Sequence, residues 1–283
     1  MTRPVLCRSV PAVLAFLLLS GLTAVPLTPV HAQSAWLDRD HRSSVLVETY
    51  FPTFDGSDSH FPTWVWFAAT RLPIGQTTWF VGELPYASGE FGTTTTMRQG
   101  SIGNPYLGIE VAPRARGVRA ELGVRIPLAS TTKAIPFVMG LYTDVGRSEA
   151  FVPDQVTARV GLHYHHPGDA ISRVAYDVRL VPAMWIKTGD AALAESEFFL
   201  GYGGTVQYVG DEVRVGGGLT GQWNVTSEFG GFGANSVHQM DLAADFLHGS
   251  VRPGVQLKVP LDHDLSDFTN ATLGVSLTVL PGL

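Results

Sequence analysis

Hydrophobic and polar residues alternate with a period of two in several long segments of this chain. In 118–128, Leu122 and Val124 fall on one face, whereas Glu121 and Arg125 fall on the other. Five more segments show the same pattern: 156–164, 213–225, 239–246, 251–261 and 271–279. Because successive side chains of a β-strand point to opposite sides, each segment predicts a strand with one apolar and one polar face.

Six less regular segments bring the prediction to twelve strands. They are 44–52, 62–72, 77–86, 104–112, 171–184 and 197–209. Segment 62–72 is apolar on both faces, so its pattern leaves the inward side open. Segment 171–184 is expected to switch faces near Pro182.

The connections between these strands alternate between short and long. Those that follow even-numbered strands have five residues or fewer, whereas those that follow odd-numbered strands have at least nine. This two-sided pattern and an even strand number are typical of outer-membrane β-barrels. A sheet in hydrocarbon closes on itself because unpaired backbone amides are costly there. We therefore expect an all-β fold, a transmembrane antiparallel β-barrel of about 12 strands with short periplasmic turns and long extracellular loops, rather than a soluble sandwich.

Residues 1–32 predict a secretory signal peptide. Arg3 and Arg8 precede an apolar stretch, and small residues end at Ala32, after which we expect cleavage. The apolar stretch is shorter than the ~20 residues that a helix needs to cross a bilayer. The mature chain, 33–283, is then a single barrel domain in the outer membrane of a Gram-negative bacterium.

The composition and net charge of the chain limit the classes of protein and partner that it fits. Of 283 residues, 45% are hydrophobic and 16% are charged, and the net charge is −6. This balance excludes a disordered chain and gives no reason to expect a nucleic-acid partner. The sole cysteine is Cys7, so an intrachain disulfide is excluded.

Every Asp, Glu, Lys and Arg of the six regular segments lies on the polar face, which we assign to the lumen. A cation on the lipid face costs about 2–4 kcal/mol at the bilayer midplane. Acids and bases are nearly balanced, which favours a packed polar core over an ion-selective ring, and Glu110–Arg119 and Asp245–Arg252 are the expected pairs. A lining that contacts a solute is the alternative. The predicted lumen-lining residues are Glu110, Arg119, Glu121, Arg125, Arg159, His163, Arg179, Arg214, Asp241, Asp245, Arg252 and Lys258.

The sequence predicts neither a metal site nor a catalytic site. The run 163–166 contains three histidines, but neither an acid nor a cysteine supplies a further ligand nearby in the sequence. A surface lipid hydrolase needs a Ser and a His with an orienting acid or amide at the membrane surface. The predicted strands do not present Ser and His at adjacent outward positions, so we expect no enzyme activity, no metal and no cofactor.

Aromatic residues near the predicted strand ends are expected to form interfacial girdles. They are Trp64, Trp66, Trp79, Tyr86, Tyr164, Tyr208 and Trp223. Trp and Tyr gather at both membrane interfaces of transmembrane barrels.

The longest connection, 129–155, has too much apolar surface for an exposed loop. Val138, Leu141, Tyr142 and Val145 follow helical spacing. We expect this segment to fold into the lumen as a plug, where Asp144, Arg147 and Glu149 can join the polar network of the wall. A hairpin that extends the barrel and a cap over its mouth are the alternatives.

Two sequence motifs resemble those of a known protein family. They are Ile102-Gly103-Asn104-Pro105-Tyr106-Leu107-Gly108 and the segment 251–261, which begins Val251-Arg252-Pro253-Gly254. The chain resembles the transporter-like outer-membrane β-barrel family named for the meta-cleavage pathway of phenol degradation. Asn104 stands where an Asp is common in that family. The resemblance implies a barrel that admits small organic compounds, and it transfers no catalytic residue.

The expected function is passive uptake or binding of small solutes, hydrophobic or aromatic ones included. The alternative is a non-transporting barrel with a structural or surface-interaction role. Expected partners are outer-membrane lipid, a small-molecule solute and the barrel-assembly machinery. The last strand supports the machinery, because Thr272, Gly274, Leu277 and Val279 have the spacing of a C-terminal assembly signal.

Overall fold

The computed structural model describes residues 43–54, 63–91, 97–112, 117–168, 172–190, 195–227 and 230–282. The predicted signal peptide lies outside these ranges and stays a prediction. Within them, no helix has the length and apolar character that crossing a bilayer requires.

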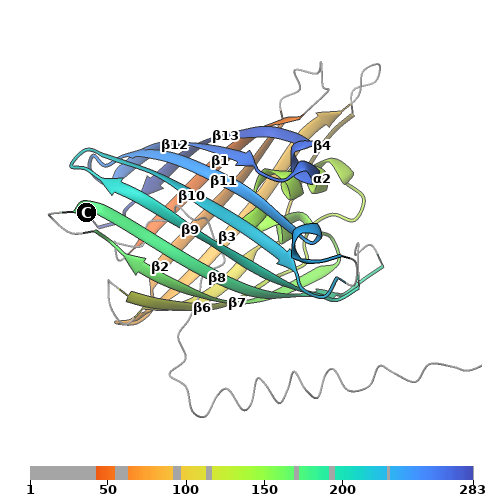
Figure 1. Ribbon diagram of the computed structural model, residues 1–283, viewed down its shortest axis with the longest axis horizontal. Helices are drawn as coiled ribbons and strands as arrows, with labels where there is room; N and C mark the ends of the chain where they lie inside the picture. Colours follow the sequence, from red (N-terminus) through yellow and green to blue (C-terminus); the bar gives the residue numbers. More distant parts are fainter. Residues whose placement is uncertain are drawn as a thin grey trace, which may run out of the picture.

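The chain forms a closed antiparallel barrel (Figure 1). Its strands are β1 (Ser44–Phe54), β2 (Trp64–Pro73), β3 (Thr78–Phe91), β4 (Met97–Ile102), β5 (Tyr106–Val111), β6 (Gly117–Arg125), β7 (Gln155–His166), β8 (Val174–Lys187), β9 (Glu197–Val209), β10 (Val213–Asn224), β11 (Ser236–Phe246), β12 (Val251–Pro260) and β13 (Thr269–Val279). Both β4 and β5 pair with β3, so together they make one interrupted strand of a 12-strand wall. Pairing of β1 with β13 closes the wall, and the predicted fold is confirmed.

The pleat of the strands separates two environments. Outward side chains such as Leu122, Val206 and Leu273 are 62%, 60% and 56% exposed and form an apolar outer surface. Inward side chains such as Glu121 and Arg125 are buried. An apolar exterior around a sheet without lateral edges is what hydrocarbon requires, because the backbone amides are satisfied within the wall.

Strand β8 does not switch faces, and the expectation of a switch near Pro182 is wrong. Val181 and Ala183 are both buried on the inner side, with Pro182 between them on the outer side. The β7–β8 register is the same before and after this point, from Arg159–Ala183 to Leu162–Leu180. Proline removes one hydrogen-bond donor from the ladder, and here it does so without a change of face.

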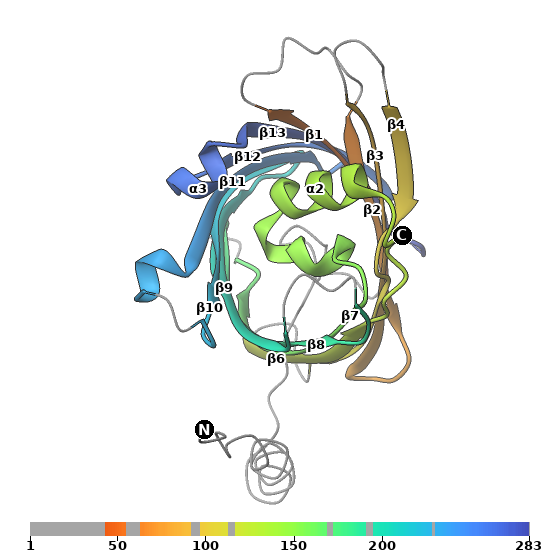
Figure 2. The same ribbon diagram turned by 90° about the vertical axis from the view of Figure 1, so that its right-hand side faces the viewer.

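The segment between β6 and β7 folds into the barrel. It forms α2 (Ala134–Thr143) and the 3-10 helix η1 (Val145–Phe151), and Figure 2 shows both inside the ring of strands. Ile135, Met139 and Phe151 pack with Phe67 and other buried residues of β1, β2 and β3. The plug prediction is therefore confirmed, and the hairpin alternative is wrong.

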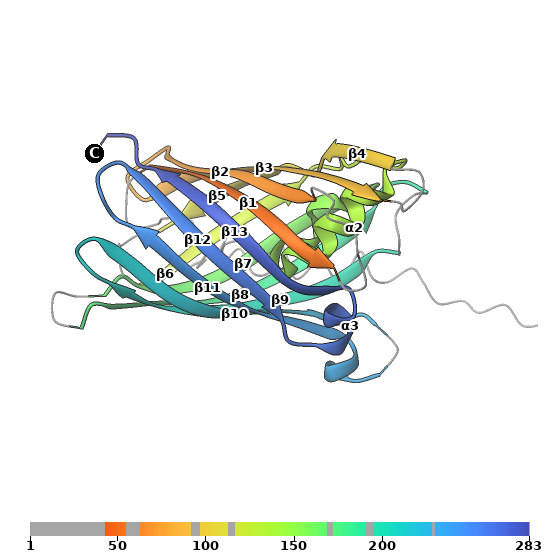
Figure 3. The ribbon, with the colours of Figure 1, turned by 90° about the horizontal axis from the view of Figure 1, so that it is seen from above.

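The plug lies toward the end of the barrel that carries the long connections. Figure 3 shows α2 at the same end as the short helix α3 (His263–Ser266), which follows β12. Tyr142 of the plug stacks on Phe268 after α3, with ring centroids 4.7 Å apart. A further turn, η2 (Phe232–Ala234), also lies in a connection at this end. The plug thus sits in the outer half of the lumen.

Candidate functional site: the plugged lumen

Arg147 of η1 is the centre of the plug. Its side chain is 1% exposed. Nη1 donates to Glu48 Oε2 of β1 at 2.7 Å and to Glu83 Oε2 of β3 at 3.1 Å. Nη2 donates to Asp144 Oδ2 at 2.7 Å and to the hydroxyl of Tyr50 at 3.2 Å. One guanidinium therefore joins the plug to two wall strands, and each of its bonds to a carboxylate is charge-assisted.

Glu149 anchors the end of η1 to β6 and β7. Arg125 of β6 donates through Nε to Glu149 Oε1 at 2.7 Å and through Nη2 to Glu83 Oε1 at 2.6 Å. Arg159 of β7 also donates to Glu149. Since Glu83 contacts both Arg125 and Arg147, the two anchors form one network.

Lys258 of β12, two strands from β1 in the wall, extends this network to β11. Its Nζ lies 3.3 Å from Asp144 Oδ2 and 2.8 Å from Asp241 Oδ1 of β11. Asp241 Oδ2 accepts from Thr220 of β10 at 3.1 Å, and Thr220 Oγ1 accepts from Arg179 of β8 at 2.6 Å. The plug is therefore tied to the wall by ions that are buried and paired, as buried charges must be.

Asn104 lies in the break between β4 and β5, and both the nitrogen and the oxygen of its side-chain amide form hydrogen bonds. Nδ2 donates to the backbone carbonyls of Glu149 at 3.1 Å and Val152 at 2.7 Å. Oδ1 accepts from the backbone amides of Leu128 at 2.9 Å and Ala129 at 2.8 Å. A carboxylate has no donor for those two carbonyls, so this position requires an amide.

The two plug acids are held ionised by their cations. Burial by itself raises the pKa of Asp144, but Arg147 and Lys258 outweigh burial and hold its pKa well below the usual range. Burial likewise raises the pKa of Glu149, and Arg159 and Arg125 reverse that effect, so its pKa is lowered overall. The docked plug therefore binds fewer protons than a free one.

The predicted lumen-lining residues fall into two groups. Arg125, Arg159, Asp241 and Lys258 belong to the plug network, and Arg179 reaches it through Thr220. The others lie elsewhere on the inner wall, Glu110, Arg119, Glu121, His163, Arg214 and Asp245 buried and Arg252 half-buried. Contact of any of the twelve with a solute stays a prediction.

The inner wall also contains ion pairs that the sequence did not suggest. Glu110 pairs with Arg71 at 2.9 Å, and Asp245 pairs with Arg214 at 2.9 Å. The sequence did not predict Arg71 as a lumen residue, because its segment, 62–72, is apolar on both faces and the pattern does not show which face points inward. Trp79 belongs to this inner group too, because its ring lies 4.1 Å from the Arg71 guanidinium. Its assignment to an interfacial girdle is therefore wrong.

Glu83 and Tyr50 are further residues that sequence reasoning missed. Glu83 lies between Gly82 and Leu84 in a segment where apolar and polar residues alternate only weakly. Tyr50 has no sequence feature that distinguishes it from other aromatic residues in strands. The outward aromatics agree better with expectation: Trp64 and Trp66 lie against Tyr86, with centroids 5.2 and 5.6 Å apart.

A narrow crevice separates η1 from the wall of β7 to β10. Its volume is 10 Å³, about the room that one water needs. The residues that line it are Val145, Gly146, Arg159, Arg179, Val181, Ala183, Gly201, Tyr202, Thr220, Gly221 and Gln222. The crevice is thus a small space between the plug and the inner wall.

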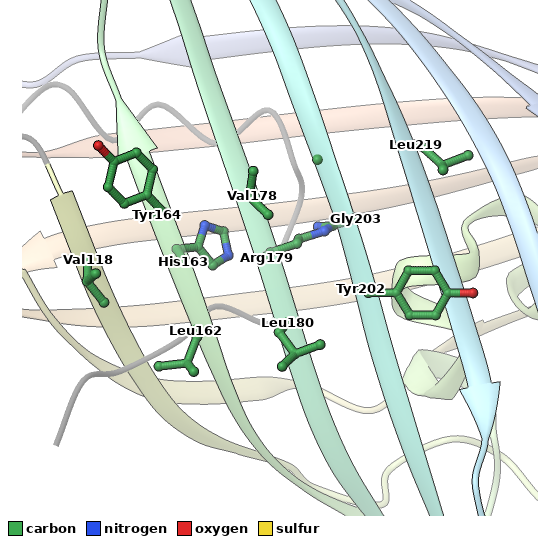
Figure 4. Close-up of a pocket in the computed structure, with 11 residues that line it drawn as sticks. Val118, Leu162, His163, Tyr164, Val178, Arg179, Leu180, Tyr202, Gly203 and Leu219 are labelled. Atoms are coloured by element: carbon green, nitrogen blue, oxygen red, sulfur yellow. The ribbon is translucent and has the colours of Figure 1, made fainter. Parts of the chain in front are cut away.

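The outer side of the same wall has an apolar hollow. It measures 630 Å³ and extends across β6 to β10 (Figure 4). Its apolar side chains, among them Leu162, Val178 and Leu219, are outward and at least 40% exposed. The hollow therefore belongs to the lipid-facing surface, not to the lumen.

Histidines of the described wall contact acids and a tyrosine in two clusters away from the plug. No group of three or more metal-ligand side chains is present there. His163 and His165 both contact Asp177, at 2.7 and 3.3 Å. On the outer wall, His238 Nδ1 lies 3.0 Å from Asp262, but its Nε2 contacts the hydroxyl of Tyr202 at 2.6 Å, where a hydrolase would have a serine.

Comparisons with known proteins show the fold. No protein-family profile and no curated sequence matches this chain. Several solved structures are similar in fold, including these three. An outer membrane channel from Pseudomonas putida F1 has a TM-score of 0.56 and 10% identity over 87% of this chain and 98% of its own. The translocator domain of the autotransporter NalP from Neisseria meningitidis has a TM-score of 0.51 and 13% identity over 95% and 97%. The NanC porin has a TM-score of 0.50 and 8% identity over 83% and 98%. Together with the apolar exterior, these likenesses show that the chain is an outer-membrane β-barrel.

Proposed function

We propose that this barrel is a constricted channel for passive passage of small solutes across the outer membrane. The observation that carries the proposal is the plug: a helical segment held in the lumen by ion pairs leaves a crevice of 10 Å³ beside it. A wall filled only by its own side chains would need no such inserted segment. The similarity to an outer membrane channel and a porin supports this class of function.

The solutes we propose are small organic compounds, hydrophobic or aromatic ones included. The crevice holds about one water, so any organic solute passes only when the plug moves, and apolar side chains such as Val145, Val181 and Ala183 form part of its lining. The resemblance of the segments around Asn104 and Pro253 to a family associated with phenol degradation points the same way.

The test is single-channel recording of the refolded protein in planar bilayers. Deletion of residues 134–148 removes α2 and part of η1, and we expect it to raise the conductance several-fold because the lumen is then open. Arg147→Gln is the milder variant, and we expect it to open the channel more often. Arg173→Gln is the matched control, since Arg173 lies at a turn outside the lumen and pairs with Asp211. Equal conductance of the wild type and the deletion variant, with the barrel intact, contradicts a plug that limits passage.

A specific observation also favours the second candidate, a non-transporting barrel with a structural or surface role. Arg125, Arg147, Glu48 and Glu83 are at most 4% exposed, so the outer half of the lumen is densely filled. The same recordings separate the two functions. A wild-type barrel that stays silent at every voltage, beside a deletion variant that conducts, supports the filled barrel and overturns the proposed channel.

A further inference from the structure

The plug is held unequally on its two sides. On one side, ion pairs join it to β1, β3, β6, β7 and β12 through Arg147, Glu149 and Asp144. Toward β8, β9 and β10 the plug borders Val181, Ala183 and Gly201, and Phe137 packs beside Trp185 in an apolar contact. Ser148 of η1 donates a hydrogen bond of 2.9 Å to Gln222. Since neutral hydrogen bonds are weaker than charge-assisted ones, the plug separates most readily from β8 to β10.

Several buried polar atoms in this region lack a hydrogen-bond partner among the described residues. They are Glu149 Oε2, Gln155 Oε1, Thr157 Oγ1, Arg159 Nε and Trp185 Nε1. Arg159 is 6% exposed and lines the crevice, so its Nε is a donor that is buried beside empty space. Buried polar groups almost always have partners, and a cluster without them indicates water or a ligand.

The charged side chains of the crevice lining are both arginines. Arg159 and Arg179 are part of the described lining, which contains no acidic side chain. The acids lie behind them: Glu149 accepts from Arg159, and Asp144 lies close enough to Arg179 for the two charges to interact. Guanidinium groups suit carboxylates because their donors match the two oxygens.

An aromatic pair stands at the outer end of the crevice. Trp185 of β8 packs on Phe199 of β9, with centroids 4.1 Å apart, beside Phe137 of the plug. Trp185 is directly opposite Thr157 on β7, two residues from Arg159. A planar apolar body therefore finds aromatic faces where its charged end finds arginine.

We propose that small aromatic carboxylates pass between η1 and the inner face of β8 to β10, with Arg159 and Arg179 binding the carboxylate and Trp185 and Phe199 contacting the ring. This inference rests on the proposed channel function and names its solute class. The passage opens when η1 moves away from β8 to β10 while its ion pairs to β1, β3 and β12 persist.

The test uses reversal potentials of the wild-type protein in planar bilayers, with gradients of sodium benzoate or benzylammonium chloride. We expect benzoate to be favoured over benzylammonium, and Arg179→Gln to lower that preference about tenfold, because a charge in a narrow, poorly hydrated passage acts strongly. If benzylammonium passes more readily than benzoate, the solute class is wrong while the channel stands. If the wild type passes no current at all, the channel itself fails.

A pair of glycine variants tests the position of the passage. Gly201 faces the crevice and Gly204 faces the lipid-side hollow, and both lie in β9. We expect Gly201→Leu to reduce benzoate current at least about tenfold, because the side chain fills a space that holds about one water. Gly204→Leu adds the same bulk toward lipid and should leave the current unchanged. Normal current through a folded Gly201→Leu barrel overturns the proposed path.

Discussion

At the scale of single residues, the direction of a side chain decides what the position tolerates. Leu122 and Glu121 are neighbours in β6, yet one is 62% and the other 1% exposed, and Glu121 accepts a hydrogen bond from Tyr106. The alternation of the sequence predicts this difference, because charged residues in the regular strands share one face. It does not predict Arg71 or Glu83, whose strands lack a clear polar face.

Leu122→Arg should insert poorly, since it places a cation toward lipid at a cost of about 2–4 kcal/mol. Glu121→Gln only weakens a polar contact in the lumen, so its insertion should match the wild type. Refolding yield into vesicles, followed by the shift in gel mobility of the unheated barrel, measures both. Equal yields for the two variants contradict the assignment of faces.

Asn104→Asp should release the end of the plug. The carbonyls of Glu149 and Val152 lose their donor and face a buried charge, at about 1–3 kcal/mol for each unsatisfied group. We expect faster protease cleavage within 129–155 while the barrel stays resistant. Asn224→Asp, at the end of β10, is the matched control and should leave the cleavage rate unchanged. A cleavage rate for Asn104→Asp equal to that of the wild type shows that the amide is not an anchor.

At the scale of elements, the plug could be predicted from sequence but its partners could not. The apolar helical pattern of 129–155 is incompatible with an exposed loop, and Asp144, Arg147 and Glu149 stood out as its charged residues. Which strands hold them depends on barrel closure, which brings Glu48 within reach of a residue 99 positions later. Register between distant strands is a property of the closed sheet, so local pattern cannot supply it.

The docking of the plug should depend on pH in one direction. The pKa values of Asp144 and Glu149 are lowered when the plug is docked, so their stabilisation is complete above about pH 4, the ordinary carboxyl value, and is lost as the pH falls further. We expect channel conductance to rise below about pH 4 and to stay constant from there to neutrality.

Glu149→Gln is the variant for this prediction. It removes one of the two acids, so the remaining rise in conductance at low pH should be smaller than in the wild type. Glu212→Gln, at a turn outside the lumen, should leave the pH profile unchanged. A conductance that falls on acidification contradicts the sign that we derive.

At the scale of the whole molecule, the wall and the plug are separable. Each strand pairs with its neighbours, and β1 closes on β13, so the ladders between strands form without the plug. The backbone amide of Asn104, at the interruption of one strand, donates to Ala150 of η1 instead. The continuous ladder of twelve strands could be predicted from strand periodicity and connection lengths alone. The interruption of one strand between Ile102 and Tyr106 could not, because it serves the plug through Asn104.

The variant without residues 134–148 should therefore remain a heat-resistant barrel. We expect its unheated form to migrate as a folded species in detergent and to unfold near the temperature of the wild type. The measurement is gel mobility after heating at stepped temperatures. Loss of the folded band at room temperature would show that the plug supports the wall.

The residues that anchor the plug come from both the first and the last strands of the chain, and this has a consequence for the order in which the barrel and the plug assemble. Arg147 needs Glu48 from β1, and Asp144 needs Lys258 from β12, so the complete set of partners exists only after the last strands have joined the first. Until then, the charges of this segment remain hydrated. Their desolvation is thus expected only after the barrel has closed, and closure in the wrong register would leave these charges without their partners.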